Sequence, residues 1–119
     1  MKKMLLLILL LLTGLVSIKA QTAEELKGKS IFKENKCTGC HAIETQGFLK
    51  KGKSSAPDLS DIGSKLKADF LKKYLKKEES QNDLKHPINF KGSDEDFVVL
   101  TDWLVTLKKQ EPVDTLKSK

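Results

Sequence analysis

Cys37 and Cys40 are separated by two residues, and His41 follows them directly. They are the only two cysteines in a chain of 119 residues. A C-x-x-C-H run is the attachment signature of c-type haem. Two thiols at this spacing can each bond one vinyl group of the same porphyrin, and the next residue can ligate the iron through an imidazole nitrogen. The run therefore predicts one covalently attached haem, with His41 as an iron ligand.

Two cysteines at this spacing have three other uses in proteins. A thioredoxin-like dithiol needs a strand before the motif and a βαβ pattern around it, whereas the residues before Cys37 are polar and helical in pattern. A zinc site would require Cys37, Cys40, His41 and His86, so that adjacent residues would bind one tetrahedral ion. A disulfide between the two cysteines is the third alternative. All three are less favoured than haem attachment.

The N-terminus has the pattern of a secretory signal peptide over residues 1–20. Lys2 and Lys3 form a basic start, residues 4–12 are apolar, and Ala20 ends the segment. The alternative is an uncleaved anchor, although the apolar stretch is shorter than the roughly 20 residues of a spanning helix. We expect an exported protein, located in the periplasm or anchored in the membrane facing the periplasm.

The remaining chain is small and weakly basic. Removal of residues 1–20 leaves 99 residues and lowers the formal net charge from +6 to +3. All the basic residues are lysines, and nucleic-acid readers rely on arginine for bidentate base contacts. We therefore expect no nucleic-acid partner. Residues 21–110 are predicted to form one domain, and residues 111–119 a flexible tail. A chain of this length has a marginal core of its own, which a bound haem would enlarge.

The hydrophobic pattern predicts helices and no strand. Thr22 and Glu25 form a capping box, and the helix that follows directs Leu26, Ile31 and Phe32 toward the core. A second helix, capped by Asp61 or Ser64, is predicted to run to about residue 79. It has one apolar face and one lysine-rich face, the latter formed by Lys72, Lys73, Lys76 and Lys77.

Residues 80–92 are predicted to be irregular. Ser93 then caps a last helix with three acidic residues in its first turn. Phe97, Leu100, Leu104 and Leu107 form its apolar stripe, with Trp103 beside it. The expected fold is all-α, with three or four helices packed around one haem.

These features resemble the class I (mono-haem) cytochrome c family over essentially the whole chain after residue 20. Gly28 and Phe32 match the family's first-helix pattern, in which the glycine lets the last helix cross closely. Trp103 matches the aromatic residue at that crossing. The resemblance also implies that the carbonyl of Pro57 accepts a hydrogen bond from the second ring nitrogen of His41, which orients the ligand.

The chain departs from the family at the distal iron ligand. Family members usually place a methionine there, but the only methionines are Met1 and Met4, both inside the predicted signal. At the corresponding position stands His86, followed by Pro87, which stiffens the segment. His86 is therefore the leading candidate for the second iron ligand. An open or water-filled site and ligation by Lys85 are the alternatives.

The expected function is transfer of single electrons between redox partners, some of them acidic, rather than enzymatic catalysis. After signal cleavage no membrane partner is expected. Two alternatives remain. One is a haem-based sensor that binds a small ligand at an open distal site. The other is an electron-delivery subunit of a larger periplasmic oxidoreductase.

Overall fold

The computed structural model describes residues 22–109, so the predicted signal peptide and the tail at 111–119 lie outside the described residues. The elements, in order, are α2 (Ala23–Glu34), the 3-10 turns η1 (Cys37–Gly39) and η2 (Glu44–Gln46), α3 (Ile62–Lys65), α4 (Ala68–Leu75) and α5 (Asp94–Thr106). Extended pairing between residues 22 and 109 is limited to two isolated bridges. The predicted all-α fold is confirmed.

Helix α2 begins where the capping box predicts. The backbone N–H of Glu25 donates to the Thr22 hydroxyl at 3.2 Å. Ile31 and Phe32 are buried, but Leu26 is 52% exposed, so its expected place in the core is wrong. Successive residues of an α-helix are 100° apart. Leu26, five positions before Ile31, therefore lies about 140° around the helix from the buried side.

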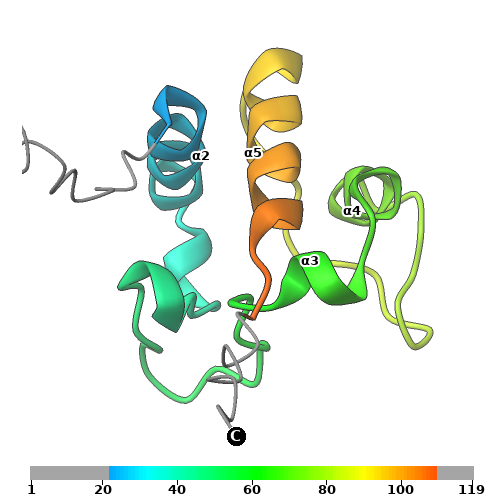
Figure 1. Cartoon of the computed structure of the whole chain (residues 1–119). Coiled ribbons are helices and arrows are strands. Elements are labelled where there is room, and N and C mark those ends of the chain that lie inside the picture. The colour runs from blue at the N-terminus through cyan, green and yellow to red at the C-terminus, as the bar shows by residue number, and fades with distance from the viewer. Residues whose placement is uncertain (1–21, 110–119) are drawn as a thin grey trace, which may run out of the picture.

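The single helix expected up to residue 79 is instead two short helices, α3 and α4. They are separated by Leu66 and Lys67, whose backbones are extended. The N–H of Gly63 donates to the carbonyl of Leu107 at 2.8 Å, so α3 is held against the end of α5. Figure 1 shows α4 beside α5, and α3 below the C-terminal end of α5. One straight helix could not make both contacts, which explains the break.

Neither expected cap holds α3 by its side chain. Asp61 occupies the position before the helix, but one of its carboxylate oxygens accepts from the backbone N–H of Lys109 at 2.7 Å. That bond holds the pKa of Asp61 below its usual value. The aspartate therefore ties the start of α3 to the chain that leaves α5.

Helix α5 is the central element of the core. Ser93 caps it by accepting from the N–H of Asp96 at 3.1 Å. Five of its residues are buried, namely Phe97, Leu100, Thr101, Trp103 and Leu104. In Figure 1 it stands between α2 and α4. An exposed ion pair between Lys27 and Asp96, at 3.3 Å, also joins α2 to α5.

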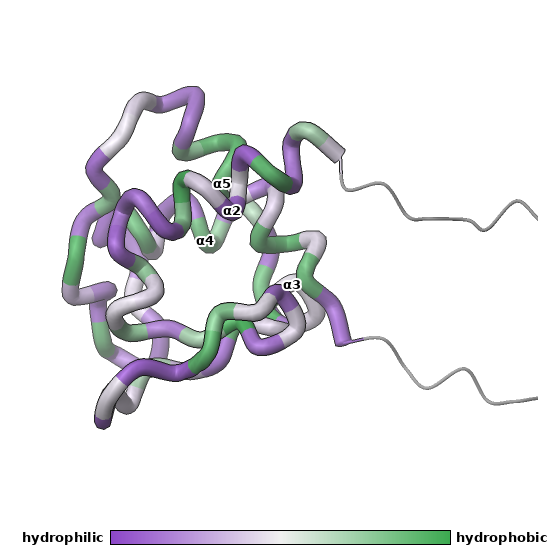
Figure 2. Tube along the Cα trace, turned by 90° about the vertical axis from the view of Figure 1, so that its left-hand side faces the viewer, coloured by the Kyte–Doolittle hydropathy of each residue, from purple (hydrophilic) through white to green (hydrophobic). Residues whose placement is uncertain are grey.

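Long connections join these helices, with residues 47–61 leading to α3 and residues 76–93 leading from α4 to α5. In Figure 2 the trace forms a ring in which hydrophobic and hydrophilic residues are interspersed. No helix between residues 22 and 109 is long and apolar enough to cross a membrane.

The residues predicted to bind haem lie on the connections between the α-helices, and the packed α-helices hold these connections in place.

Candidate haem site

The motif residues lie on one tight turn directly after α2. Lys36, with a left-handed φ of 58°, reverses the chain and starts the 3-10 turn η1. The N–H groups of Cys40 and His41 then both donate to the carbonyl of Cys37, at 3.1 and 2.9 Å. This turn brings both thiols and the imidazole into one small region, as attachment of a single porphyrin requires.

The two cysteines differ in environment. Cys37 is half-buried and packs against the core, whereas Cys40 is exposed, and the two are not joined in a disulfide. Burial raises the pKa of the Cys37 thiol to about 11. Because neither cysteine is in a disulfide, both sulfurs are available to form thioether bonds.

His41 is oriented by a backbone carbonyl far from it in sequence. Its Nδ1 lies 2.8 Å from the carbonyl oxygen of Pro57. Because a carbonyl can only accept, Nδ1 carries the proton, and Nε2 of the neutral ring keeps its lone pair for a metal. Burial lowers the pKa of His41; the Pro57 bond opposes this, and nearby His86 adds to it. This is the contact that the family resemblance implies.

Three hydrogen bonds hold Pro57 in place by joining its segment to the chain after His41. The N–H of Leu59 donates to the carbonyl of Ala42 at 2.9 Å. Asp58 accepts from the N–H of Glu44 at 3.4 Å, and the Ser60 hydroxyl accepts from the N–H of Thr45 at 3.2 Å. The position of the proximal carbonyl is thus fixed by polar groups that the sequence analysis did not identify.

His86 lies in the long connection between α4 and α5. Its Nδ1 is 2.6 Å from the carbonyl oxygen of Ile88, so by the same reasoning Nε2 is again the nitrogen left for a metal. Tyr74 of α4 packs edge-on against the ring, with centroids 5.4 Å apart. His86 is half-buried, while its neighbour Lys85 is exposed. The local environment therefore favours His86 over Lys85 as a ligand.

His41 and His86, 45 positions apart in sequence, lie close together with nearly parallel rings. Their ring centroids are 6.2 Å apart and their planes differ by 10°. A histidine–metal bond is about 2 Å and the ring nitrogen lies about 1.2 Å from the centroid, so two imidazoles on opposite sides of one metal ion have centroids roughly 6 Å apart. The separation of the two centroids thus matches that of two histidine ligands of one metal ion. Together with the paired thiols, this donor set fits haem c.

Comparison with known protein families assigns the chain to one of them. The family model for cytochrome c matches residues 26–108. The chain belongs to the cytochrome c family. Its cofactor is accordingly haem c, bound covalently and containing iron, and the protein is a haem-binding electron carrier. The comparisons with curated proteins and with solved structures gave no match.

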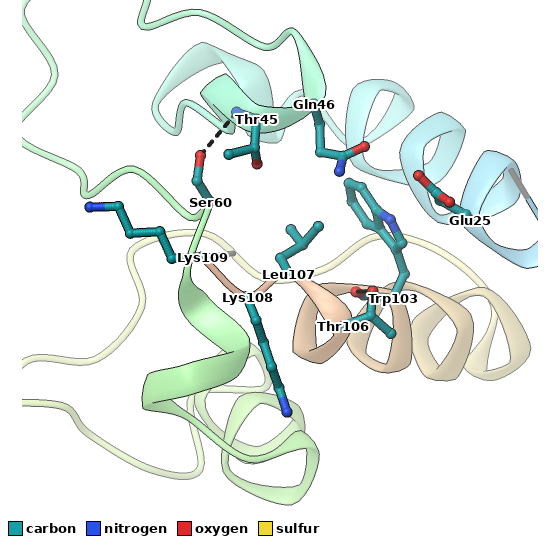
Figure 3. A pocket seen from close by; sticks show the side chains of 9 residues that line it. All are labelled: Glu25, Thr45, Gln46, Ser60, Trp103, Thr106, Leu107, Lys108 and Lys109. Atoms are coloured by element: carbon teal, nitrogen blue, oxygen red, sulfur yellow. Dashed lines mark hydrogen bonds between the residues drawn. The ribbon is translucent and has the colours of Figure 1, made fainter. Parts of the chain in front are cut away.

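A cavity of about 570 Å³ lies elsewhere in this cytochrome. Trp103, Ser60 and Lys109 are among the residues around it, and Figure 3 shows their side chains. None of the four residues predicted to hold haem lines this cavity. The indole Nε1 of Trp103 is buried without a hydrogen-bond partner among the described residues. The cavity is thus separate from the haem site.

Residues 22–109 contain no group of three or more His, Cys, Asp or Glu side chains placed to hold a metal ion. The zinc site considered for Cys37, Cys40, His41 and His86 is therefore not formed. In this cytochrome the two imidazoles instead form a pair of nearly parallel rings. An ion held by that pair needs its remaining ligands from another source, which a porphyrin provides.

Proposed function

We propose that this protein is an exported c-type cytochrome that carries single electrons between redox partners. Its haem would be attached through Cys37 and Cys40 and ligated axially by His41 and His86. When bound, the haem supplies the one-electron exchange between ferric and ferrous iron. We expect the haem to carry electrons rather than to catalyse a reaction, because the proposed coordination leaves no open position on the iron.

The observation that carries this proposal is the separation of 6.2 Å between the centroids of the two nearly parallel imidazole rings. Each ring has its Nδ1 bonded to a backbone carbonyl, Pro57 for one and Ile88 for the other. These bonds fix the tautomer and raise the basicity of both rings as ligands. They also restrict rotation of the rings, so both ligands stay in place when the charge on the iron changes.

The proposals that the protein is exported and that its partners are acidic rest on other features of the sequence. Residues 1–20 provide the signal, which would deliver the chain to the periplasm or, if uncleaved, anchor it there. The chain presents many lysines, so acidic redox proteins are the expected partners. Delivery of electrons within a larger oxidoreductase uses the same haem site. Co-purification of the native protein would distinguish that subunit role from a free carrier.

The test of the ligand set is the pair of variants His86→Ala and Lys85→Ala in the haem-loaded protein. We expect the wild type to be low-spin in both oxidation states. His86→Ala should give high-spin ferric haem and rapid binding of carbon monoxide. Lys85→Ala, the matched control in the same loop, should behave as the wild type.

Two results would contradict the bis-histidine assignment. If His86→Ala leaves the spectra and the carbon monoxide kinetics unchanged, His86 is not the ligand. If Lys85→Ala opens the site instead, lysine is the ligand. A wild-type protein that is already high-spin and binds carbon monoxide without a lag would favour the sensor function.

A further inference from the structure

Two side chains fasten the loop that carries His86 to the helices on either side. On one side, the Lys77 ammonium donates to the carbonyl oxygen of Pro87 at 3.0 Å. On the other, the Asn35 side chain accepts from the N–H of Lys91 at 3.2 Å and donates to the carbonyl of Ile31 at 3.0 Å. Lys77 therefore binds the residue directly after His86, whereas Asn35 binds the loop four residues beyond Pro87.

The backbone at Lys77 is unusual for a lysine. Its φ of +59° is left-handed, a conformation that glycine or asparagine adopts at lower cost at the end of a helix. Its N–H donates to the carbonyl of Tyr74 at 3.0 Å, which closes the last turn of α4. A residue needed only to end the helix would not have to be a lysine. The side chain, half-buried and reaching Pro87, provides an additional contact.

The contact between Lys77 and Pro87 lies directly next to His86 in the chain, where it can influence the position of the His86 ring. The His86 ring is bonded to the carbonyl of Ile88, two residues ahead within the same loop. That bond orients the ring relative to the loop and does not fix the loop to the protein. The bond from Lys77 to the intervening Pro87 links this short unit to α4. A hydrogen bond from an ammonium group is stronger than one between neutral groups.

We propose that Lys77 is a positioning residue for the distal ligand, and this inference rests on the proposed ligation of iron by His86. Its bond to Pro87 keeps the His86 unit closed over the distal face. Without that bond the loop opens more often, and the iron is more often accessible to an external ligand. The loss of one charge-assisted hydrogen bond corresponds to about a tenfold change in an equilibrium of this kind.

The experiment compares Lys77→Met, Lys77→Arg and Lys73→Met in the haem-loaded protein. Carbon monoxide binding to the ferrous form is followed by stopped flow. We expect binding about ten times faster in Lys77→Met, because opening of the loop limits access. Lys77→Arg keeps a cationic donor and should bind close to the wild-type rate. Lys73→Met removes the same charge from an exposed position on α4, four residues before Lys77, and should also match the wild type.

The same substitution in a His86→Ala background separates this inference from the proposed function. With the distal ligand removed, Lys77→Met should have no further effect on the rate. If Lys77→Met is still faster there, or if Lys73→Met is equally fast in the wild-type background, Lys77 is not a positioning residue, although His86 can remain the ligand. A wild-type protein that is high-spin before any substitution would instead overturn the ligation by His86.

Discussion

The indole of Trp103 occupies the space that a side chain at position 28 would need. A Cβ built on Gly28 would lie 2.5 Å from Cγ and 2.6 Å from Cβ of Trp103. Both residues are buried where α2 and α5 meet. The close approach of the two helices therefore depends on the absence of a side chain at this glycine, in agreement with the close crossing that the family resemblance implies.

Gly28→Ala should destabilise the haem-loaded protein. Although alanine favours helix formation, the added methyl group must displace Trp103 or separate the helices, which typically costs about 1–3 kcal/mol. The thermal midpoint of the ferric protein, followed by far-ultraviolet circular dichroism, should fall. Gly39→Ala is the control, because a Cβ there meets nothing within 4 Å. Equal midpoints for the two variants would contradict the packing argument.

The near-parallel imidazole planes predict the form of the ferric electron paramagnetic resonance spectrum. Planes that differ by only 10° act on the two iron π-orbitals unequally, and this unequal effect separates the orbitals in energy. We expect a well-resolved rhombic low-spin signal. Perpendicular planes would leave the orbitals nearly equal and give a single signal at large g. Observation of that large-g signal would show that the rings are not parallel when haem is bound.

The identity of the distal ligand should set the reduction potential. Thioether ligation raises the potential in cytochromes c, whereas a second imidazole favours ferric iron. The wild-type protein should therefore lie well below methionine-ligated members of the family. His86→Met should raise the potential, with appearance of the methionine–iron charge-transfer band. A higher potential without that band would mean that the new sulfur is not bound.

Asp58 should contribute stability that depends on pH. Burial alone would raise its pKa, but the hydrogen bonds from Ser60 and Glu44 outweigh burial and lower the pKa below the usual 3.8. A carboxyl with a lowered folded-state pKa stabilises the protein above its unfolded-state pKa, and this contribution is lost as the pH falls through the folded value. Asp58→Asn should therefore lower the free energy of unfolding near neutral pH. Below about pH 4 the free energy of unfolding of the variant should fall less steeply with decreasing pH than that of the wild type. If the free energies of unfolding of variant and wild type fall equally steeply in acid, Asp58 does not have this role.

Association with an acidic partner should weaken as salt increases, because the attraction is screened. Not all of the expected lysine face is equally available. Lys72 lies 3.6 Å from Asp102, and Lys77 bonds to Pro87, whereas Lys73 and Lys76 are exposed. Charge reversal at Lys73 and Lys76 should slow electron transfer to an acidic protein at low salt and have little effect at high salt. Rates that do not depend on salt in either protein would identify the lysines as a solvated helix face only.

The chemistry of this protein was readable from short stretches of sequence. The C-x-x-C-H run defines its own local spacing, so Cys37, Cys40 and His41 could be identified without a fold. The helix caps at Thr22 and Ser93 were equally local, because the hydroxyl and the N–H it satisfies are three residues apart. The all-α fold followed from periodicity along the chain.

Only the tertiary structure decided which distant groups meet. The break between α3 and α4 arises because both must pack on α5, a demand that no window of sequence around residue 66 contains. The same applies to Leu26, whose exposure depends on where α5 lies. The carbonyl of Pro57 reaches His41, and the ammonium of Lys77 reaches Pro87, through backbone paths set by long-range packing. Residue type and local spacing determine the chemistry available, whereas burial and orientation depend on the whole chain.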